Sequence, residues 1–293
     1  QWALVRVGRT SIADYLALAQ GLQGSRERAV ASLLIDRLQY VGNYLVEEGD
    51  RERYRSWLAS LLKPAAQELG FAAAPGDSDD RKTLRATVFQ ALGNAGDPQA
   101  IAAARRLAEQ ALHAPAAVDA NLASAALRIA ARNGDAALYD RFLAAMSAAP
   151  TPEWTFRFLS ALTAFRDEAL IRRSLDLALS PRLRAQDLPA FTSQLLANPA
   201  GQRLAWEFLK AHWPELQTRV VSFGGGGAVG ALGSICEAGM GGDVERFFAA
   251  HRAPGAERTV RHSLEDIRNC VELKSRQQKP LHDWLQRSAA AAR

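Results

Sequence analysis

Residues 184–213 read RAQDLPAFTSQLLANPAGQRLAWEFLKAHW, and this stretch decides the fold. Asn198 precedes Pro199, so a side chain able to cap a helix stands directly before a proline at the first helical position, where the missing N–H costs nothing. Trp206 and Trp213 are seven residues apart, and we interpret them as core side chains wedged between helices rather than as platforms for a substrate. The stretch therefore predicts packed helices.

Apolar residues recur at helical spacing along nearly the whole chain. Stripes of the form i, i+3, i+4, i+7 occur at residues 54–62, 139–146 and 244–251. Alternating apolar and polar residues, which would indicate strands, are nearly absent. Apolar residues make up 48% of the chain, which supplies a continuous core and argues against disorder. We predict an all-α protein without a sheet.

A turn that ends in aspartate recurs before predicted helices, at Asp97, Asp135, Asp167 and Asp243. The intervals are 38, 32 and 76 residues, and 76 is twice 38, with the missing copy near Asn198. A period of about 35 residues with two helices each is typical of an α-solenoid, here one of HEAT-like antiparallel helix pairs. A ligand would lie on the concave face of such a solenoid.

Two further segments resemble capping boxes, in which a serine caps a helix and an acid follows three residues later. They are Ser11 with Asp14 and Ser263 with Asp266. Both predict the start of a helix.

The charged residues do not indicate a nucleic-acid partner. The 36 basic and 31 acidic residues leave a net charge of +5, and no window groups five or six basic residues. Nucleic-acid interfaces usually show such clusters. Arginine outnumbers lysine and alanine is abundant, which favours a GC-rich bacterial source.

The two cysteines, Cys236 and Cys270, are too few for a disulfide framework, and each lies in a helical apolar pattern. We expect buried, inert thiols and a reducing compartment, the cytoplasm. No apolar run approaches the roughly 18 residues of a membrane span, so no membrane partner is expected. The chain opens at Gln1 as a helix entered midway, without a cap or signal peptide, and we expect it to begin inside a larger protein.

No catalytic, cofactor-binding or metal-binding residue is predicted in this chain. Its five histidines include no H-E-x-x-H pair, the spacing that brings two imidazoles to one zinc ion. Gly225, Gly227 and Gly230 satisfy G-x-G-x-x-G formally, but no βαβ unit surrounds them. We interpret the glycine run as a link into a helix at residues 228–237.

Ala205-Trp206, in the opening stretch, and the run PGAERT at residues 254–259 carry a family resemblance. With the segments around them, from residue 184 to 285, they resemble the end of the zinc aminopeptidases of the aminopeptidase N family, closest to the puromycin-sensitive branch. The resemblance implies that residues 1–293 form a single helical repeat domain at the C-terminus of a larger enzyme. The upstream catalytic domain would hold the zinc ion, and no cofactor is expected in this chain.

The resemblance also implies a non-catalytic role, in which the chain caps the active-site chamber and contributes to the access and binding of peptide substrates. Its partners would be the upstream catalytic domain of the same polypeptide and the peptides. The alternative is a stand-alone α-solenoid that binds a protein partner. A solenoid that binds nucleic acid is a third hypothesis, which the dispersed arginines do not favour.

Candidate substrate-binding residues are arginines of this region: Arg184, Arg258, Arg261 and Arg268. A guanidinium group can grip a peptide carboxylate with two hydrogen bonds, or donate to peptide carbonyls. The competing interpretation is structural, with Arg184 paired to Asp187 and Arg258 or Arg268 paired to Glu257 or Asp266.

Overall fold

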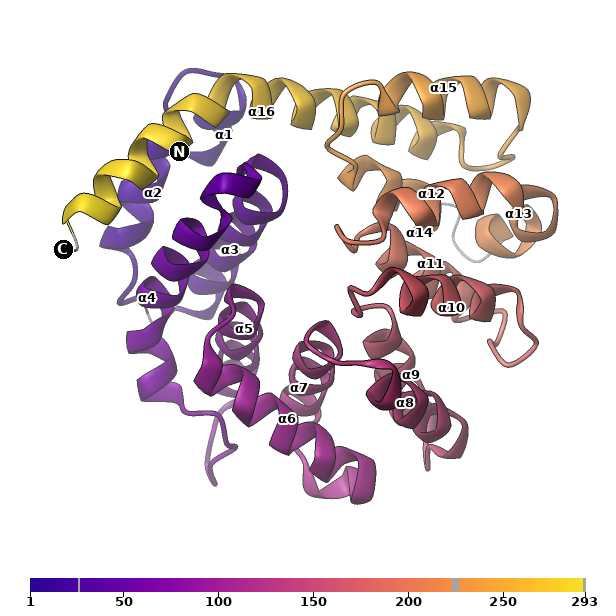
Figure 1. Cartoon of the computed structure of the whole chain (residues 1–293), viewed down its shortest axis with the longest axis horizontal. Helices are drawn as coiled ribbons and strands as arrows, with labels where there is room; N and C mark the ends of the chain where they lie inside the picture. The colour runs from indigo at the N-terminus through magenta and orange to yellow at the C-terminus, as the bar shows by residue number, and fades with distance from the viewer. Residues whose placement is uncertain (26, 223–226, 292–293) are drawn as a thin grey trace. The chain divides into compact units, whose positions relative to one another are not determined.

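The computed structural model of the chain describes residues 1–25, 27–222 and 227–291 (Figure 1). Within these residues every regular element is a helix, so the all-α prediction is confirmed. The chain forms two compact units, which we describe separately: unit 1 is Gln1–Ala130 with Leu273–Arg293, and unit 2 is Ala131–Glu272. The single repeat domain over residues 1–293 stays a prediction.

Unit 1 contains the first seven α-helices, three short turns of helix and the last part of α16. They are α1 (Trp2–Arg6), α2 (Ile12–Gly21), α3 (Arg28–Tyr40), the π-helical η1 (Val41–Leu45), η2 (Glu48–Asp50), α4 (Arg51–Leu69), α5 (Asp79–Ala95), α6 (Pro98–His113), η3 (Pro115–Ala117), α7 (Ala120–Arg132, whose end lies in unit 2) and α16 (Glu257–Ala291) from residue 273 onward.

Close backbone approaches in the core of unit 1 require glycine at two positions. A Cβ atom at Gly42 would lie 2.8 Å from the ring of Tyr54, whose hydroxyl donates a buried hydrogen bond to the carbonyl of Leu38 at 2.7 Å. A Cβ atom at Gly93 in α5 would lie 2.6 Å from Ile129 in α7. Because interiors are close-packed, any larger residue at either position would push helices apart.

The end of α16 closes unit 1 against the start of the chain. The side chain of Gln277 is buried, accepts a hydrogen bond from the backbone N–H of Ile12 at 2.9 Å and donates to the carbonyl of Thr10 at 3.2 Å. Nδ1 of His282 lies 2.6 Å from Oδ2 of the buried Asp50. Residues more than 230 positions apart in the sequence therefore hold each other in unit 1.

The loop between α4 and α5 is anchored by a buried ion pair. The guanidinium of Arg85, 2% exposed, donates to the carbonyl of Leu69 at 2.8 Å and lies 2.6 Å from Oδ2 of Asp77. Asp77 also accepts from the backbone N–H of Ala74 at 2.8 Å. The hydrogen bond from Arg85, with that from Ala74, lowers the pKa of the Asp77 carboxyl to about 2.

Unit 2 contains α8 to α15 and the first part of α16. The helices are α8 (Ala136–Ala148), α9 (Pro152–Leu162), α10 (Glu168–Leu179), α11 (Leu188–Leu196), α12 (Gln202–Ala211), α13 (Trp213–Ser222), α14 (Gly227–Ala231), η4 (Leu232–Ser234), α15 (Met240–Ala250) and α16 up to residue 272. The glycine run at residues 224–226 lies outside the described residues. The helix after it is shorter than the predicted 228–237, because α14 ends at Ala231 and gives way to the 3-10 turn η4.

Side-chain contacts in unit 2 recur at one sequence interval. The interval is 32 to 37 residues for the hydrogen bonds and ion pairs Tyr139–Ser174, Asn198–Thr163, Trp206–Asp243, Gln202–Ser234, Arg203–Glu237 and Ser263–Val229. This interval is close to the predicted repeat of about 35 residues. The solenoid of HEAT-like pairs stays a prediction.

Three of the four repeated aspartates cap a helix as predicted. Asp97, Asp135 and Asp167 each accept a hydrogen bond from a backbone N–H three residues later, at 2.9, 3.0 and 3.1 Å. The prediction is wrong for Asp243, which lies inside α15. That helix begins at Met240, after Gly239 with its φ of +85°, so Asp243 belongs to its first turn and is not the residue that caps it.

The capping box at Ser11 is confirmed at the start of α2, whereas two other predicted helix starts are wrong. Ser263 lies within α16, and its buried hydroxyl donates to the carbonyl of Val229 at 2.8 Å. Asn198 precedes α12 by four residues, and its amide donates to the carbonyls of Thr163 and Phe165 at 2.9 and 2.8 Å. Both side chains serve tertiary contacts instead of caps.

The expectation of free thiols is also wrong, because Cys236 and Cys270 form a disulfide with a Cα–Cα distance of 5.4 Å. The two residues are 34 positions apart, which is one repeat interval. The tertiary packing of unit 2 therefore brings together two cysteines that are far apart in sequence.

Candidate functional site

The four candidate arginines all lie in unit 2, but not together. Arg184 lies in the turn before α11, and its Nε is 2.6 Å from Oδ2 of Asp187. This is the ion pair that the structural interpretation predicts for it. Because this ion pair already occupies Nε of Arg184, Arg184 is the weakest of the four candidates for contact with a ligand.

The other three candidates, Arg258, Arg261 and Arg268, lie on α16 at helical spacing, which places them on one side of the helix. The structural interpretation offered Glu257 or Asp266 as the partner of Arg258 or Arg268. Nε of Arg258 instead donates to Nε2 of His262 at 3.2 Å. Glu257 instead accepts from the backbone N–H of Gly255. No ion pair in the described part of the chain involves Arg261 or Arg268.

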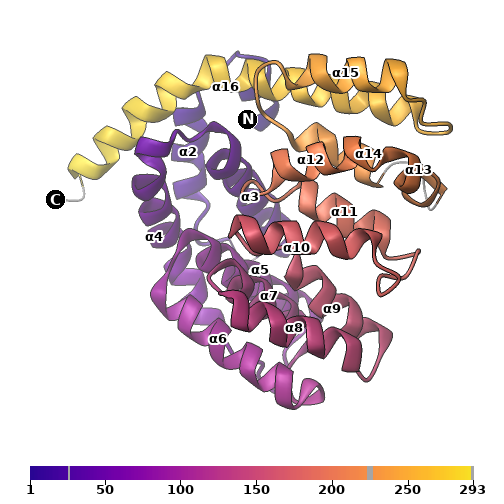
Figure 2. The same ribbon diagram turned by 45° about the vertical axis from the view of Figure 1, so that its right-hand side comes forward.

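Arg268 differs from the other candidates because it lines a pocket between α15 and α16, which run alongside each other in both views (Figures 1 and 2). The pocket has a volume of about 240 Å³. Its lining residues are Glu237, Gly239, Gly241, Gly242, Glu245, Leu264, Ile267, Arg268, Val271 and Glu272. We call it the α15–α16 pocket.

Glycines make room for the α15–α16 pocket on one side and aliphatic side chains form the other side. A Cβ atom at Gly241 would lie 3.6 Å from Ile267, so a longer side chain there would meet the α16 wall. Gly239 has a φ of +85°, a conformation that glycine adopts without strain. The α16 wall consists of Leu264, Ile267 and Val271, which offer a surface for apolar parts of a ligand.

The rim of the pocket carries charges of both signs. Glu237 forms an ion pair with Arg203, whereas Glu245 and Arg268 have no ion pair within the residues that the structure describes. The third acid, Glu272, adds a further carboxylate to the rim. Since these carboxylates would repel a free carboxylate, a neutral carbonyl oxygen is the acceptor that best suits the guanidinium of Arg268.

Polar contacts fix α15 against α12 behind the pocket. Nε1 of Trp206 donates to Oδ2 of Asp243 at 2.7 Å, and Nζ of Lys210 donates to the same oxygen at 3.0 Å. The hydrogen bond from Trp206, followed by that from Lys210, lowers the pKa of the Asp243 carboxyl below its usual value.

Trp206 and Trp213 are core residues, as predicted, with 0% and 2% exposure. The ring of Trp206 lies 5.2 Å from that of Phe247, and the ring of Trp213 lies 5.8 Å from it. Both indoles therefore support α15 from inside unit 2 and do not face a ligand.

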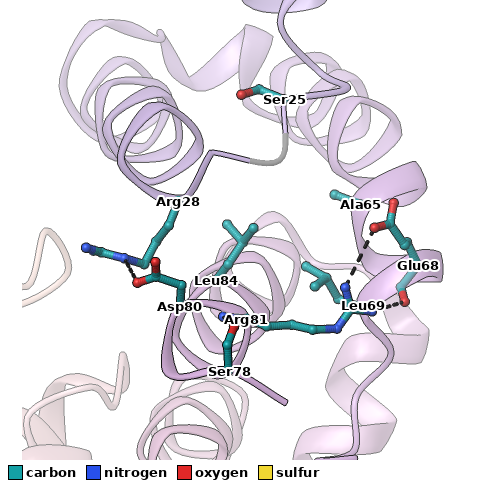
Figure 3. Close-up of a pocket in the computed structure, with 9 residues that line it drawn as sticks. All are labelled: Ser25, Arg28, Ala65, Glu68, Leu69, Ser78, Asp80, Arg81 and Leu84. Atoms are coloured by element: carbon teal, nitrogen blue, oxygen red, sulfur yellow. Dashed lines mark hydrogen bonds and ion pairs between the residues drawn. The ribbon is translucent and has the colours of Figure 1, made fainter. Parts of the chain in front are cut away.

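Sequence reasoning missed a second pocket, of about 220 Å³, which lies in unit 1 where α3, α4 and α5 meet (Figure 3). Arg28 forms an ion pair with Asp80, and Arg81 donates to the carbonyl of Glu68 at 3.1 Å and lies 3.8 Å from its carboxylate. Because acids of the same pocket already engage both guanidinium groups, this pocket offers less to a charged ligand than the α15–α16 pocket. The signal in the sequence that could have indicated this pocket is the density of charged residues at 77–82.

Among the described residues, no three His, Cys, Asp or Glu side chains come together to hold a metal ion. No described helix is both long enough and apolar enough to cross a membrane.

Comparison with known proteins places the chain in a family. Residues 1–269 match the family model of the ERAP1-like C-terminal domain, so the chain belongs to that family. The match covers most of both units and agrees with the resemblance in residues 184–285.

Relatives with this similarity are aminopeptidases. The chain is 26% identical to aminopeptidase M1-A of Oryza sativa over 91% of its own length, and 25% identical to aminopeptidase A of Gloydius brevicauda over 98%. It is 25% identical to aminopeptidase N of Lactobacillus helveticus over 72% of its length. It spans 31%, 30% and 25% of these relatives, respectively, so each is much longer than the matched region.

Proposed function

We propose that this chain is the non-catalytic C-terminal domain of a zinc-dependent aminopeptidase that releases N-terminal residues from peptides. The observation that carries the proposal is the match of residues 1–269 to the ERAP1-like C-terminal domain, together with the similarity of the chain to relatives named aminopeptidases. The catalytic chemistry would belong to the part of those relatives that this chain does not cover.

The zinc ion of such an enzyme would be bound outside the described residues. The chain has no H-E-x-x-H segment, and its described part brings no three ligand side chains together. A catalytic zinc ion needs three protein ligands, and the H-E-x-x-H motif supplies two of them as imidazoles one helical turn apart. The residues of this chain would therefore act on the peptide and not on the metal.

The proposed role of the chain is to cap the active-site chamber and to contact the distal part of a bound peptide. Arg268 is the best-placed contact of the four candidate arginines, because it lines a pocket and forms no described ion pair. It would donate to a peptide carbonyl while the peptide's apolar groups lie against Leu264, Ile267 and Val271. Arg258 and Arg261, on the same side of α16, would extend this contact.

The test is to compare the complete polypeptide that carries this chain with a version that ends before it. We expect the complete enzyme to cleave peptides, to lose activity when a chelator removes zinc, and to discriminate between short and long peptides. The shortened enzyme should lose solubility or that discrimination. A shortened enzyme that stays soluble and cleaves short and long peptides equally well would refute the capping role.

The second candidate is a stand-alone scaffold that binds a protein partner. The contacts one repeat apart in unit 2 favour it, since repeat architectures often bind proteins. An open reading frame that starts directly before Gln1 would support the scaffold. An upstream H-E-x-x-H segment in the same frame would support the aminopeptidase.

A further inference from the structure

The disulfide between Cys236 and Cys270 lies at the edge of the α15–α16 pocket. Cys236 directly precedes Glu237, and Cys270 directly precedes Val271, both of which line the pocket. The bond thus joins the segment that leads into α15 to the wall formed by α16.

The disulfide is the last of a series of contacts along the first half of α16. Ser263 donates to the carbonyl of Val229, and Gly233 approaches Asp266 so closely that a Cβ atom would lie 3.0 Å from its Cβ. These contacts fix α16 to the segment at 229–233, which precedes the pocket. Only the disulfide holds α16 covalently to the segment at 235–239, at the pocket itself.

The burial of the two cysteines favours a lasting bond. Cys270 is 4% exposed and Cys236 is partly buried, so a reducing thiol has limited access to the sulfurs. The sequence contains no other cysteine, so this pair has no competing partner within the chain.

We propose that the Cys236–Cys270 disulfide is a clamp that shapes the α15–α16 pocket, and that the chain acquires it in an oxidising compartment. The significance of the pocket for peptides rests on the proposed function, whereas the clamp itself does not. Intracellular glutathione keeps most thiols reduced, so disulfides accumulate mainly in exported or extracellular proteins. The expectation of a cytoplasmic location depended on free thiols, and that premise is wrong.

The bond forms by thiol–disulfide exchange with a protein or low-molecular-weight disulfide as the oxidant. The thiolate of one cysteine attacks a sulfur of the oxidant, breaks its S–S bond and forms a mixed disulfide. The second cysteine thiolate then displaces the remaining oxidant sulfur, which leaves as a thiolate. Two electrons and two protons pass to the oxidant, which ends as two thiols.

The first test counts thiols and measures thermal stability on the chain of residues 1–293. After export to a bacterial periplasm, alkylation followed by mass spectrometry should find both cysteines blocked until a phosphine reductant is added. Reduction should lower the Tm of unit 2 by about 10 °C, since opening a 34-residue loop restores chain entropy to the unfolded state. The double variant C236S/C270S should melt like the reduced protein and should not respond to reductant.

The second test locates the effect by hydrogen–deuterium exchange. Reduction should speed exchange in peptides covering residues 235–245 and 264–272, while α9 (Pro152–Leu162) serves as the internal control. Folded, exported protein with two free thiols would overturn the proposal. So would an unchanged Tm on reduction, or a change in exchange that spares the pocket segments. Because these measurements use no peptide, their outcome does not depend on whether the proposed enzymatic role is correct.

Discussion

The two units of this protein are stabilised by contacts of different range. In unit 2, polar contacts join residues about one repeat apart, such as Tyr139 to Ser174 at a separation of 35. In unit 1, the end of α16 contacts residues near the start of the chain, and Gln277 bonds to Ile12 at a separation of 265. Unit 2 can therefore form by successive local packing, whereas unit 1 is complete only when the last helix is present.

The largest expected effect follows from this difference. Removing residues 273–293 takes away the buried side chains of Leu273, Leu281, Trp284 and Leu285. Each contributes roughly 1.5–3 kcal/mol by burial, so their loss should unfold much of unit 1. Limited proteolysis should then cut within residues 1–130 and spare unit 2. Deleting only residues 292–293 is the control, and a shortened chain with unit 1 still protected would contradict the comparison.

A single core substitution should destabilise unit 2 by a smaller amount. Trp206→Ala removes a fully buried indole and the hydrogen bond that it donates to Asp243, which should cost about 3–5 kcal/mol. Denaturant unfolding followed by exchange in residues 131–272 measures the change. Trp206→Phe is the matched control and should cost less, because the ring contact with Phe247 is kept. A loss below about 1 kcal/mol for the alanine variant would show that Trp206 does not support unit 2.

Unit 1 should respond to acid through Asp77. The pKa of its carboxyl is lowered to about 2 in the folded chain, so the ionised form adds stability above its ordinary pKa of 3.8. This contribution should disappear as pH falls from about 4 to about 2. Asp77→Asn should be less stable at neutral pH, because Arg85 loses its buried partner, and should lose this pH dependence. Thermal melting of the wild type and of Asp77→Asn between about pH 4 and about pH 2 measures this difference. If the Tm of both proteins falls in parallel with pH, Asp77 does not cause the acid response.

The helix caps should have smaller and nearly equal effects in the two units. Asp97→Ala in unit 1 and Asp135→Ala in unit 2 each remove one cap hydrogen bond, at an expected cost of about 1 kcal/mol. Asp243→Ala removes no cap but breaks the hydrogen bonds to Trp206 and Lys210. Urea unfolding of the three variants separates these roles. If Asp135→Ala leaves the free energy of unfolding unchanged, the cap at the start of α8 does not contribute to the stability of unit 2.

The sequence predicted the features that depend on local spacing. Asp97, Asp135 and Asp167 cap helices because aspartate before a helix bonds to the first free N–H groups wherever the chain folds. Trp206 and Trp213 are buried because large apolar groups seven residues apart must find a core. The family resemblance rested on the same region and agrees with the match to the ERAP1-like C-terminal domain.

The features that depend on tertiary packing were missed. Cys236 and Cys270 looked like separate core thiols, because only the tertiary packing of unit 2 brings them together. Ser263 and Asn198 looked like caps, although their hydrogen bonds go to residues one repeat away. Arg268 was a candidate from the sequence, but its pocket depends on α15 beginning at Met240, close beside α16.

The most direct test of the account is a kinetic comparison in the complete polypeptide that carries this chain. Arg268→Ala should raise KM about tenfold for long peptides, because one charge-assisted hydrogen bond to the peptide is lost. It should leave kcat and KM unchanged for a single aminoacyl substrate. Arg184→Ala is the matched control and should change neither, since its guanidinium already pairs with Asp187. Equal kinetics of the Arg268→Ala and wild-type enzymes on long peptides would contradict the proposal that this chain contacts the substrate.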